Sequence, residues 1–297
     1  MSDKIVAVSK YIDPCSDWGF KRIFGTDANK DLLIAFLNAL FQRREPISEI
    51  TYNKNEHKGN TRNDRNVIYD ISCKDDKNEL FILEMQRTRK DNFEDRAVYY
   101  ACRCISDLAP IKRRSEWDYN LKKVYMIGIL DNFVLKKRGK EEYFHDACLI
   151  YKRTGDLVSD KIWFIFVELL NFKKLDSALD TELDKWLYAL KNMSNMDEIP
   201  VCLQQPIFQK LFNIAEYVNL TKEEQMSYDQ DLKNKWDNYS ALAYAKGEGI
   251  EEGIKEGIKE GERRKAISTA RELKKMGISL NQIAAAIELS VEEIAAL

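Results

Sequence analysis

The chain has 297 residues and a formal net charge of −2, and 44% of its residues are hydrophobic. Its only histidines are His57 and His145, so a zinc site built from histidines and a Ser–His–Asp triad are nearly excluded. No stretch approaches the ~20 apolar residues that span a bilayer. The first ten residues, MSDKIVAVSK, lack the apolar core of a signal peptide, so we expect a soluble cytoplasmic protein with no membrane partner.

Cysteine spacing and charge distribution narrow the class further. The six cysteines show no CxxC spacing, which favours reduced thiols over a metal or disulfide framework. Residues 101–140 hold ten Lys or Arg against four Asp or Glu, including KRR at 112–114 and KKR at 136–138. This basic segment permits nucleic-acid binding, although solvated lysines explain most such runs.

The N-terminal stretch, residues 11–41, predicts two helices. Phe20, Ile23 and Phe24 form a short apolar helical face that stops at Gly25, and Asp31 can begin a second helix with an apolar repeat. Asp17 and Lys21, four residues apart, are consistent with an exposed ion pair worth a few tenths of a kcal/mol.

Residues 48–59 predict a strand that becomes polar toward its end. Glu56 lies near Asp70 if this strand pairs with the strands that follow. We therefore keep Glu56 as an auxiliary carboxylate, beside the alternative that it is a solvated loop residue.

The segment 66–86, NVIYDISCKDDKNELFILEMQ, predicts a β-hairpin. Two runs rich in β-branched and aromatic residues flank the polar cluster DDKN at 75–78. Alternation along each strand places Glu84 beside Gln86 on one face, and Asp70 with Lys74 on a face of the first strand.

Two carboxylates within these apolar strands have two explanations. Either Asp70 and Glu84 lie on the wet face of an edge sheet, or they hold a divalent cation with Gln86 beside them. Mg²⁺ prefers carboxylate oxygens and keeps several waters, so two carboxylates suffice for it.

A helix is predicted after the hairpin, within residues 87–109. Arg96 and Tyr100 lie one turn apart on it. Either they present a cation and a phenol to a phosphate, or Tyr100 belongs to the core and Arg96 is its surface neighbour. The following run 122–135 is apolar enough to be a central strand covered on both faces.

The second half of the chain carries no catalytic pattern. The run 161–172 predicts a buried strand or a tight helix, of which we favour a strand that extends the sheet, and Glu168 within it is expected to be paired in the core. From 176 to 245 the pattern turns helical.

The tail is distinguished by glycine at 249, 253, 257 and 261, each followed by isoleucine except the last. Such glycines cost about 1 kcal/mol each inside a helix, so their spacing favours close approach of a second backbone or a flexible tether. Two capping-box patterns, at Ser279 and Ser290, predict two short C-terminal helices that favour a protein contact over DNA reading.

Taken in order, these motifs resemble the PD-(D/E)XK nuclease superfamily and, within it, the Rpn family of recombination-promoting nucleases and transposases of bacteria. The motifs that carry the resemblance span nearly the whole chain: DWGFKRIFG (17–25), KDLLIAFLNALF (30–41), VIYDISCKD (67–75), FILEMQR (81–87), the FxxRxxYY pattern (93–100) and VYMIGIL (124–130).

The resemblance implies a mixed α/β fold. Its restriction-endonuclease-like core has the order αβββαβ, with a mixed central sheet flanked by helices and a helical C-terminal extension. We accordingly expect a nuclease-like domain at 1–175, a helical extension at 176–245 and a Gly-periodic tail at 246–297.

The resemblance also implies Mg²⁺-dependent DNA cleavage, with Mn²⁺ as the alternative ion and Asp70 and Glu84 as its ligands. Gln86 stands where many superfamily members have lysine, and Lys74 or Arg96 is expected to replace that charge. Arg96 and Tyr100 match the spacing of a QxxxY helix motif, with Arg for Gln. Asp17 falls where an N-terminal helix acid assists in some members.

Two functions follow as expectations. The first is a DNA endonuclease associated with recombination or transposition, which forms a homo-oligomer through its tail. The second is a nuclease-fold module with weak or no cleavage that binds nucleic acid or protein.

Overall fold

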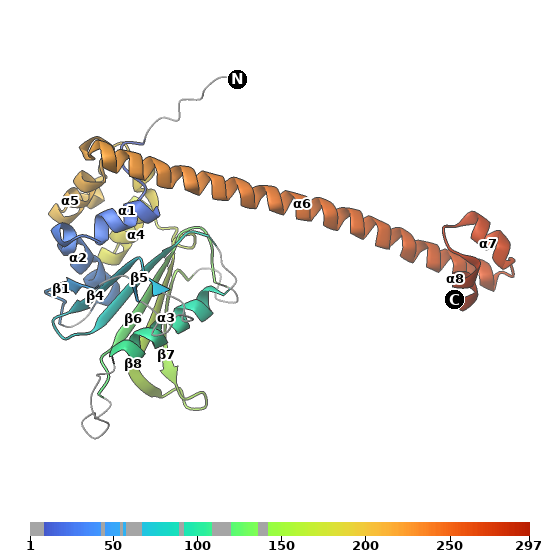
Figure 1. Ribbon diagram of the computed structural model, residues 1–297, viewed down its shortest axis with the longest axis horizontal. Helices are drawn as coiled ribbons and strands as arrows, with labels where there is room; N and C mark the ends of the chain where they lie inside the picture. Colours follow the sequence, from blue (N-terminus) through green and yellow to red (C-terminus); the bar gives the residue numbers. More distant parts are fainter. Residues whose placement is uncertain are drawn as a thin grey trace. The chain divides into compact units, whose positions relative to one another are not determined.

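The computed structural model describes two compact units, Met1–Leu232 and Lys233–Leu297 (Figure 1). For residues 56, 57 and 67 it describes the backbone alone. The described residues are 9–42, 45–53, 56–57, 67–88, 92–108, 120–135 and 142–297.

A six-stranded mixed sheet with the order β1-β4-β5-β6-β8-β7 forms the centre of the first unit. The β1–β4, β4–β5 and β7–β8 pairs are antiparallel, whereas β5–β6 and β6–β8 are parallel. A separate two-stranded sheet joins β2 to β3. The strands are β1 Ile50–Tyr52, β2 Glu56–His57, β3 Val67–Ile68, β4 Ile71–Asp75, β5 Leu80–Gln86, β6 Val124–Leu130, β7 Phe144–Ile150 and β8 Leu157–Glu168.

Helices cover both faces of the large sheet. One face packs against α1, α2, α4 and α5, and the other packs against α3. The α-helices are α1 Asp17–Phe24, α2 Lys30–Phe41, α3 Phe93–Leu108, α4 Glu182–Asn192, α5 Pro206–Ala215, α6 Lys222–Lys275, α7 Leu280–Ala286 and α8 Val291–Ala296. The short 3-10 helices are η1 Asp27–Asn29, η3 Asp176–Ala178, η4 Met193–Asn195, η5 Val201–Leu203 and η6 Tyr217–Asn219.

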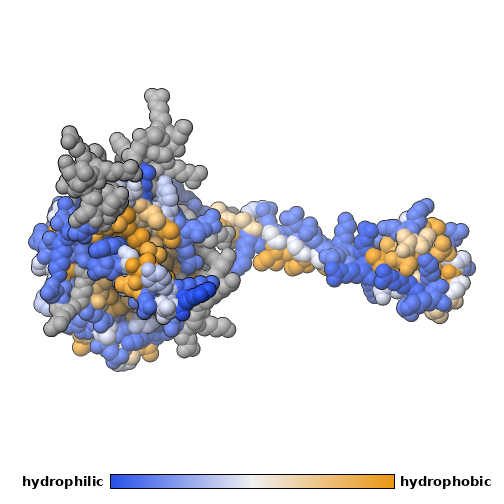
Figure 2. Space-filling model, turned by 90° about the horizontal axis from the view of Figure 1, so that it is seen from below, coloured by the Kyte–Doolittle hydropathy of each residue, from blue (hydrophilic) through white to orange (hydrophobic). Residues whose placement is uncertain are grey.

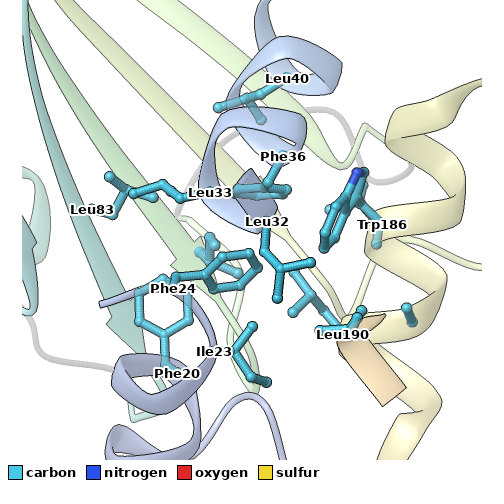
Figure 3. Close-up of a cluster of buried hydrophobic side chains, with 14 of the residues drawn as sticks. Phe20, Ile23, Phe24, Leu32, Leu33, Phe36, Leu40, Leu83, Trp186 and Leu190 are labelled. Carbon is cyan, nitrogen blue, oxygen red and sulfur yellow. The ribbon is translucent and has the colours of Figure 1, made fainter. Parts of the chain in front are cut away.

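The larger hydrophobic core lies between the sheet and the four-helix layer (Figure 3). The Trp186 ring of α4 lies 5.8 Å from the Phe24 ring of α1 and 5.7 Å from the Phe36 ring of α2. Leu83 of β5 contributes from the sheet side. Because these side chains are almost fully buried, α1 is fixed against the strand that carries Glu84.

The opposite face holds a smaller core under α3. Phe93, Ala97 and Ala101 pack there against alternate residues of β5 and β6. Gly128 of β6 permits this close approach, since a Cβ at that position meets the Phe93 ring at 2.8 Å. The burial of all seven residues of β6 confirms the prediction of a central strand.

The second unit consists of the later part of α6 together with α7 and α8. Ala270, Ile283, Leu289 and Ile294 form its small core. Ser290 makes the predicted capping box with Glu293. The capping box predicted at Ser279 does not form, because its hydroxyl donates to the Gln282 side chain. The predicted helix, α7, follows without a side-chain cap.

The predicted mixed α/β fold, with a mixed sheet between helices, is confirmed. Glu168 is paired as predicted, since its carboxylate accepts the Leu135 N–H at 2.8 Å and lies 3.3 Å from His145 Nε2. The prediction of a continuous first strand in the hairpin is wrong, because the backbone leaves the strand conformation at Tyr69 and Asp70. The boundaries expected at 175 and 245 stay predictions.

Candidate active site

Asp70 occupies the break between β3 and β4. Ile71 pairs with Leu83 of the antiparallel neighbour, so Asp70, the residue before it, lies next to Glu84. Its carboxylate accepts a hydrogen bond from the Met85 backbone N–H at 2.8 Å. The preceding residue, Tyr69, is fully buried, and its hydroxyl lies 3.0 Å from Cys104 Sγ of α3. The turn that presents Asp70 is therefore anchored from two sides.

Glu84 is a buried acid in the middle of an apolar strand. Its side chain is on the α3 side of the sheet, as is that of Ile82 two residues before, and the residue is only 7% exposed. Within the described residues, Glu84 Oε1 is buried and has no hydrogen-bond partner. An acceptor left in this state normally costs 1–3 kcal/mol or more, so it fits a site that receives a cation or a proton.

The electrostatics of the two acids agree with this. Burial, together with the charge of Asp70, raises the pKa of Glu84 to about 8. The charges of Arg96 and Lys21 and the backbone N–H of Asp70 act in the opposite direction. Burial also raises the pKa of Asp70, against the lowering effects of the Met85 N–H and Lys21. Two acids that cannot both ionise cheaply form a site for positive charge.

Gln86 and Arg96 form a connected pair beside the acids. The Gln86 amide donates to the Thr88 carbonyl oxygen at 2.8 Å, and its side-chain oxygen accepts from Arg96 Nη2. The Arg96 guanidinium lies 5.7 Å from the Phe93 ring centroid and 5.8 Å from that of Tyr100. The structure therefore places the Arg96 guanidinium near Glu84, where it binds Gln86.

Tyr100 belongs to the same group. Burial raises its pKa, and the nearby charge of Glu84 raises it further. Its ring packs edge-on against Tyr69 at 5.3 Å. Arg96 and Tyr100 thus extend from α3 toward Glu84, one turn apart.

The chain as a whole was compared with known protein families. A family model described as PD-(D/E)XK nuclease family transposase matches residues 14–245. The chain belongs to this family. The match includes all the residues described above and confirms the resemblance seen in the sequence. No curated protein and no solved structure matches the chain.

Membership in the PD-(D/E)XK family supports a nuclease-type function. Nucleases of this family generally use divalent metal ions. The part of the chain that the structure describes contains no group of three or more His, Cys, Asp or Glu placed to hold a metal. Asp70 and Glu84 alone suit an ion that keeps several waters, such as Mg²⁺, and not one that needs four protein ligands.

The structure does not bring every predicted residue to this site. Lys74 is exposed and pairs with Leu80, four strand residues from Asp70, or about 13 Å along β4. Glu56 lies in β2, opposite Ile68 of β3, and its side chain is not among the described atoms. The basic runs at 112–114 and 136–138 lie outside the described residues.

Asp17 is connected to the site through Lys21, which the sequence predicts only as its partner in an exposed ion pair. Lys21 Nζ lies 2.7 Å from Asp17 Oδ1 and 3.6 Å from Asp70 Oδ1. The spacing of Asp17 and Lys21 indicated their contact but not what they face, because that depends on the packing of α1 against β5. Within the described residues, no helix combines the length and apolar character needed to cross a membrane.

Proposed function

We propose that this PD-(D/E)XK family member is a Mg²⁺-dependent endonuclease that hydrolyses phosphodiester bonds of DNA in the cytoplasm, with Mn²⁺ as an alternative ion. The observation that carries this proposal is the buried, partnerless Glu84 Oε1 beside Asp70. A purely structural acid in such a place normally acquires hydrogen-bond partners, as Glu168 does in the same sheet.

In this proposal Asp70 and Glu84 hold the ion. When bound, the ion lowers the pKa of a coordinated water and polarises the scissile phosphate. Hydrolysis would consume one water: its oxygen would bond to phosphorus as the phosphorus–oxygen ester bond breaks, and the proton that this water loses would be matched by the one that the departing sugar oxygen takes up. The products are a phosphate monoester end and a free hydroxyl.

Residues of α3 position the substrate. Arg96 and Tyr100 offer a guanidinium and a phenol to a phosphate, and Gln86 orients Arg96 through its side-chain oxygen. The hydrogen bond from Gln86 to Thr88 fixes the amide in turn. DNA as substrate agrees with the ten basic residues against four acidic ones in 101–140. The transposase description of the family supports a role in recombination or transposition.

The second unit supports a further proposal, that the chain forms a homo-oligomer through its tail. Ile250, Ile254 and Ile258 are each more than half exposed on α6. Figure 2 shows apolar surface along part of the long helix. Beside these isoleucines, a Cβ added at Gly249, Gly253, Gly257 or Gly261 meets nothing within 4 Å. Such a face is costly to leave in water and leaves room for a second backbone.

A second candidate function is a nuclease-fold module that binds nucleic acid or protein with weak or no cleavage. It is favoured by the neutral Gln86, whose two amide atoms are both engaged, and by the engagement of Arg96 with it. Neither group is then free to act on a phosphate without rearranging.

Nicking of supercoiled plasmid, with Mg²⁺ or Mn²⁺, tests the proposal. We expect metal-dependent nicking by the wild type and its loss in Asp70→Ala and in Glu84→Ala. Lys74→Ala is the matched control and keeps wild-type nicking, because Lys74 lies on the same strand but away from the acids. Equal behaviour of all four proteins, with no metal-dependent nicking, would contradict the nuclease proposal and favour the binding module.

A further inference from the structure

Gln86, two residues after Glu84 on the same strand, is neutral, so a positive charge near the two acids comes from other elements. Two described cations contribute to the electrostatics of Glu84, namely Arg96 and Lys21. They come from opposite layers, since α3 covers one face of the sheet and α1 the other. Arg96 is held by Gln86.

The Lys21 ammonium contacts two carboxylates. It lies 2.7 Å from Asp17 Oδ1 and 3.6 Å from Asp70 Oδ1, and the side chain is 41% exposed. A lysine amine with two carboxylates as neighbours is charged at neutral pH. It is a partly exposed charged group beside Asp70, on a flexible four-carbon stem.

The helix that carries Lys21 is rigidly placed. Ser16 caps it by accepting the Gly19 N–H at 2.9 Å, and Phe20, Ile23 and Phe24 are fully buried against the sheet. Gly19 lies so close to the preceding chain that a Cβ there meets the Asp13 carbonyl oxygen at 2.2 Å. The base of the Lys21 side chain is therefore fixed relative to Asp70, while the ammonium can move by a few ångströms.

We infer that Lys21 is a catalytic residue of this chain, which binds a non-bridging oxygen of the scissile phosphate and supplies the charge that Gln86 does not. This inference rests on the proposed function for its substrate. In the free protein Lys21 neutralises Asp70. A divalent ion held by Asp70 would take over that role and would leave the ammonium, held by Asp17, to bind the phosphate. Charge placed where it develops in the transition state commonly contributes 10²–10³-fold in rate.

The test compares Lys21→Met and Lys21→Arg with Lys210→Met in the full-length chain. Lys210 is a matched control, because its ammonium contacts Asp31 at 2.6 Å with 37% of the side chain exposed, similar to Lys21, but on α5. Three quantities are measured: single-turnover cleavage with Mg²⁺, Mn²⁺ affinity without DNA, and the salt dependence of binding to a short DNA duplex in Ca²⁺.

We expect Lys21→Met to lower the cleavage rate about 100-fold or more, and Lys21→Arg to recover most of it. Mn²⁺ affinity of Lys21→Met should stay equal or rise several-fold, because the ammonium no longer competes for Asp70. The slope of log affinity against log salt should fall by about one, the value for one lost phosphate contact. Lys210→Met should match the wild type throughout.

The outcomes separate this inference from the proposed function. Wild-type cleavage and an unchanged salt slope in Lys21→Met overturn the role of Lys21 and leave the nuclease intact. Loss of Mn²⁺ affinity in Lys21→Met also overturns it, since Lys21 then only supports the acid pair. If the wild type does not cleave yet Lys21→Met loses one unit of slope, the phosphate contact stands and the nuclease proposal fails.

Discussion

The carboxylate of Asp70 accepts the backbone N–H of Met85, the residue after Glu84 in β5, at 2.8 Å. This bond ties the break before β4 to the strand that carries the second acid. Each acid receives a backbone donor from the other strand, since the Asp70 N–H lowers the pKa of Glu84, yet Glu84 Oε1 stays buried without a partner within the described residues.

The first prediction concerns the dependence of stability on pH. The pKa of Glu84 is raised from its ordinary value of 4.5 to about 8 in the folded chain. Between these values the unfolded chain has lost the proton and the folded chain still holds it, so stability falls as pH rises. One pKa unit corresponds to about 1.4 kcal/mol, and the whole effect is on the order of a few kcal/mol. Glu84→Gln should remove this part of the decline in urea unfolding of the metal-free protein between pH 5 and 8.5.

Two controls accompany this measurement. Glu45→Gln, in which an exposed acid is replaced, should keep the wild-type decline. Millimolar Mg²⁺ at pH 8.5 should stabilise the wild type and leave Glu84→Gln unchanged, because binding to the native state alone stabilises it. A steep decline retained in Glu84→Gln would show that other groups cause it.

The second prediction concerns Arg96, whose charge lowers the pKa of Glu84. Arg96→Ala should raise that pKa and so move the midpoint of pH-dependent Mn²⁺ binding to higher pH, since a carboxylate must lose its proton to bind metal. Arg96→Lys keeps the charge and should keep the midpoint near that of the wild type, while losing the planar contact with Gln86. Mn²⁺ titrations at several pH values check this, and equal midpoints in all three proteins would contradict it.

The sequence was sufficient to place Glu84 and Gln86 on one face of a strand. Period-two alternation depends only on the chain itself, and apolar periodicity likewise predicted α1, α2 and the strand β8. Glu168 was expected to be paired because an unpaired charge in a buried strand is costly. In the structure its carboxylate contacts the Leu135 N–H, the Asn171 amide and the His145 ring.

Other features depend on contacts that no local pattern contains. The break at Asp70 follows from burial of Tyr69 under α3 and from the bond to Met85, both made by residues distant in the chain. Lys74 was expected near Asp70 because alternation places both on one face of the strand, but four strand residues, about 13 Å, separate them along β4. From its sequence spacing Lys21 is an ordinary surface lysine, because its position beside Asp70 depends on the packing of α1 against β5.

The third prediction tests the packing of α3 on the sheet. In Gly128→Ala the new Cβ meets the Phe93 ring at 2.8 Å and the Phe166 ring at 3.0 Å, so one ring or the strand has to shift. We expect a loss of about 1–3 kcal/mol in the free energy of unfolding of the first unit. Gly247→Ala is the control, because nothing lies within 4 Å of its added Cβ, and it should not destabilise the chain. Urea unfolding monitored by aromatic fluorescence measures both.

The last prediction concerns the direction in which two tails pair. Along α6, the row of glycines borders a row of acidic residues, and the row of isoleucines borders a mostly basic row. The acidic row holds Glu252, Glu256 and Glu260, and the basic row holds Lys255 and Lys259. In a parallel pair related by a twofold axis, each flank of one helix meets the opposite flank of its partner, so isoleucines meet glycines and basic residues meet acidic ones. An antiparallel pair brings like flanks together and opposes equal charges.

We therefore expect a parallel dimer of the full-length chain. Ile254→Lys should convert it to monomer in light scattering, whereas Ile278→Lys, at an exposed isoleucine outside this row, should leave the mass unchanged. Reversing the acidic row to lysine should weaken the dimer, and reversing the basic row to glutamate in the same chain should restore it, because the flanks are then complementary again. In an antiparallel pair the first reversal only exchanges one like-charge contact for another, so an unweakened dimer in that variant would exclude the parallel arrangement.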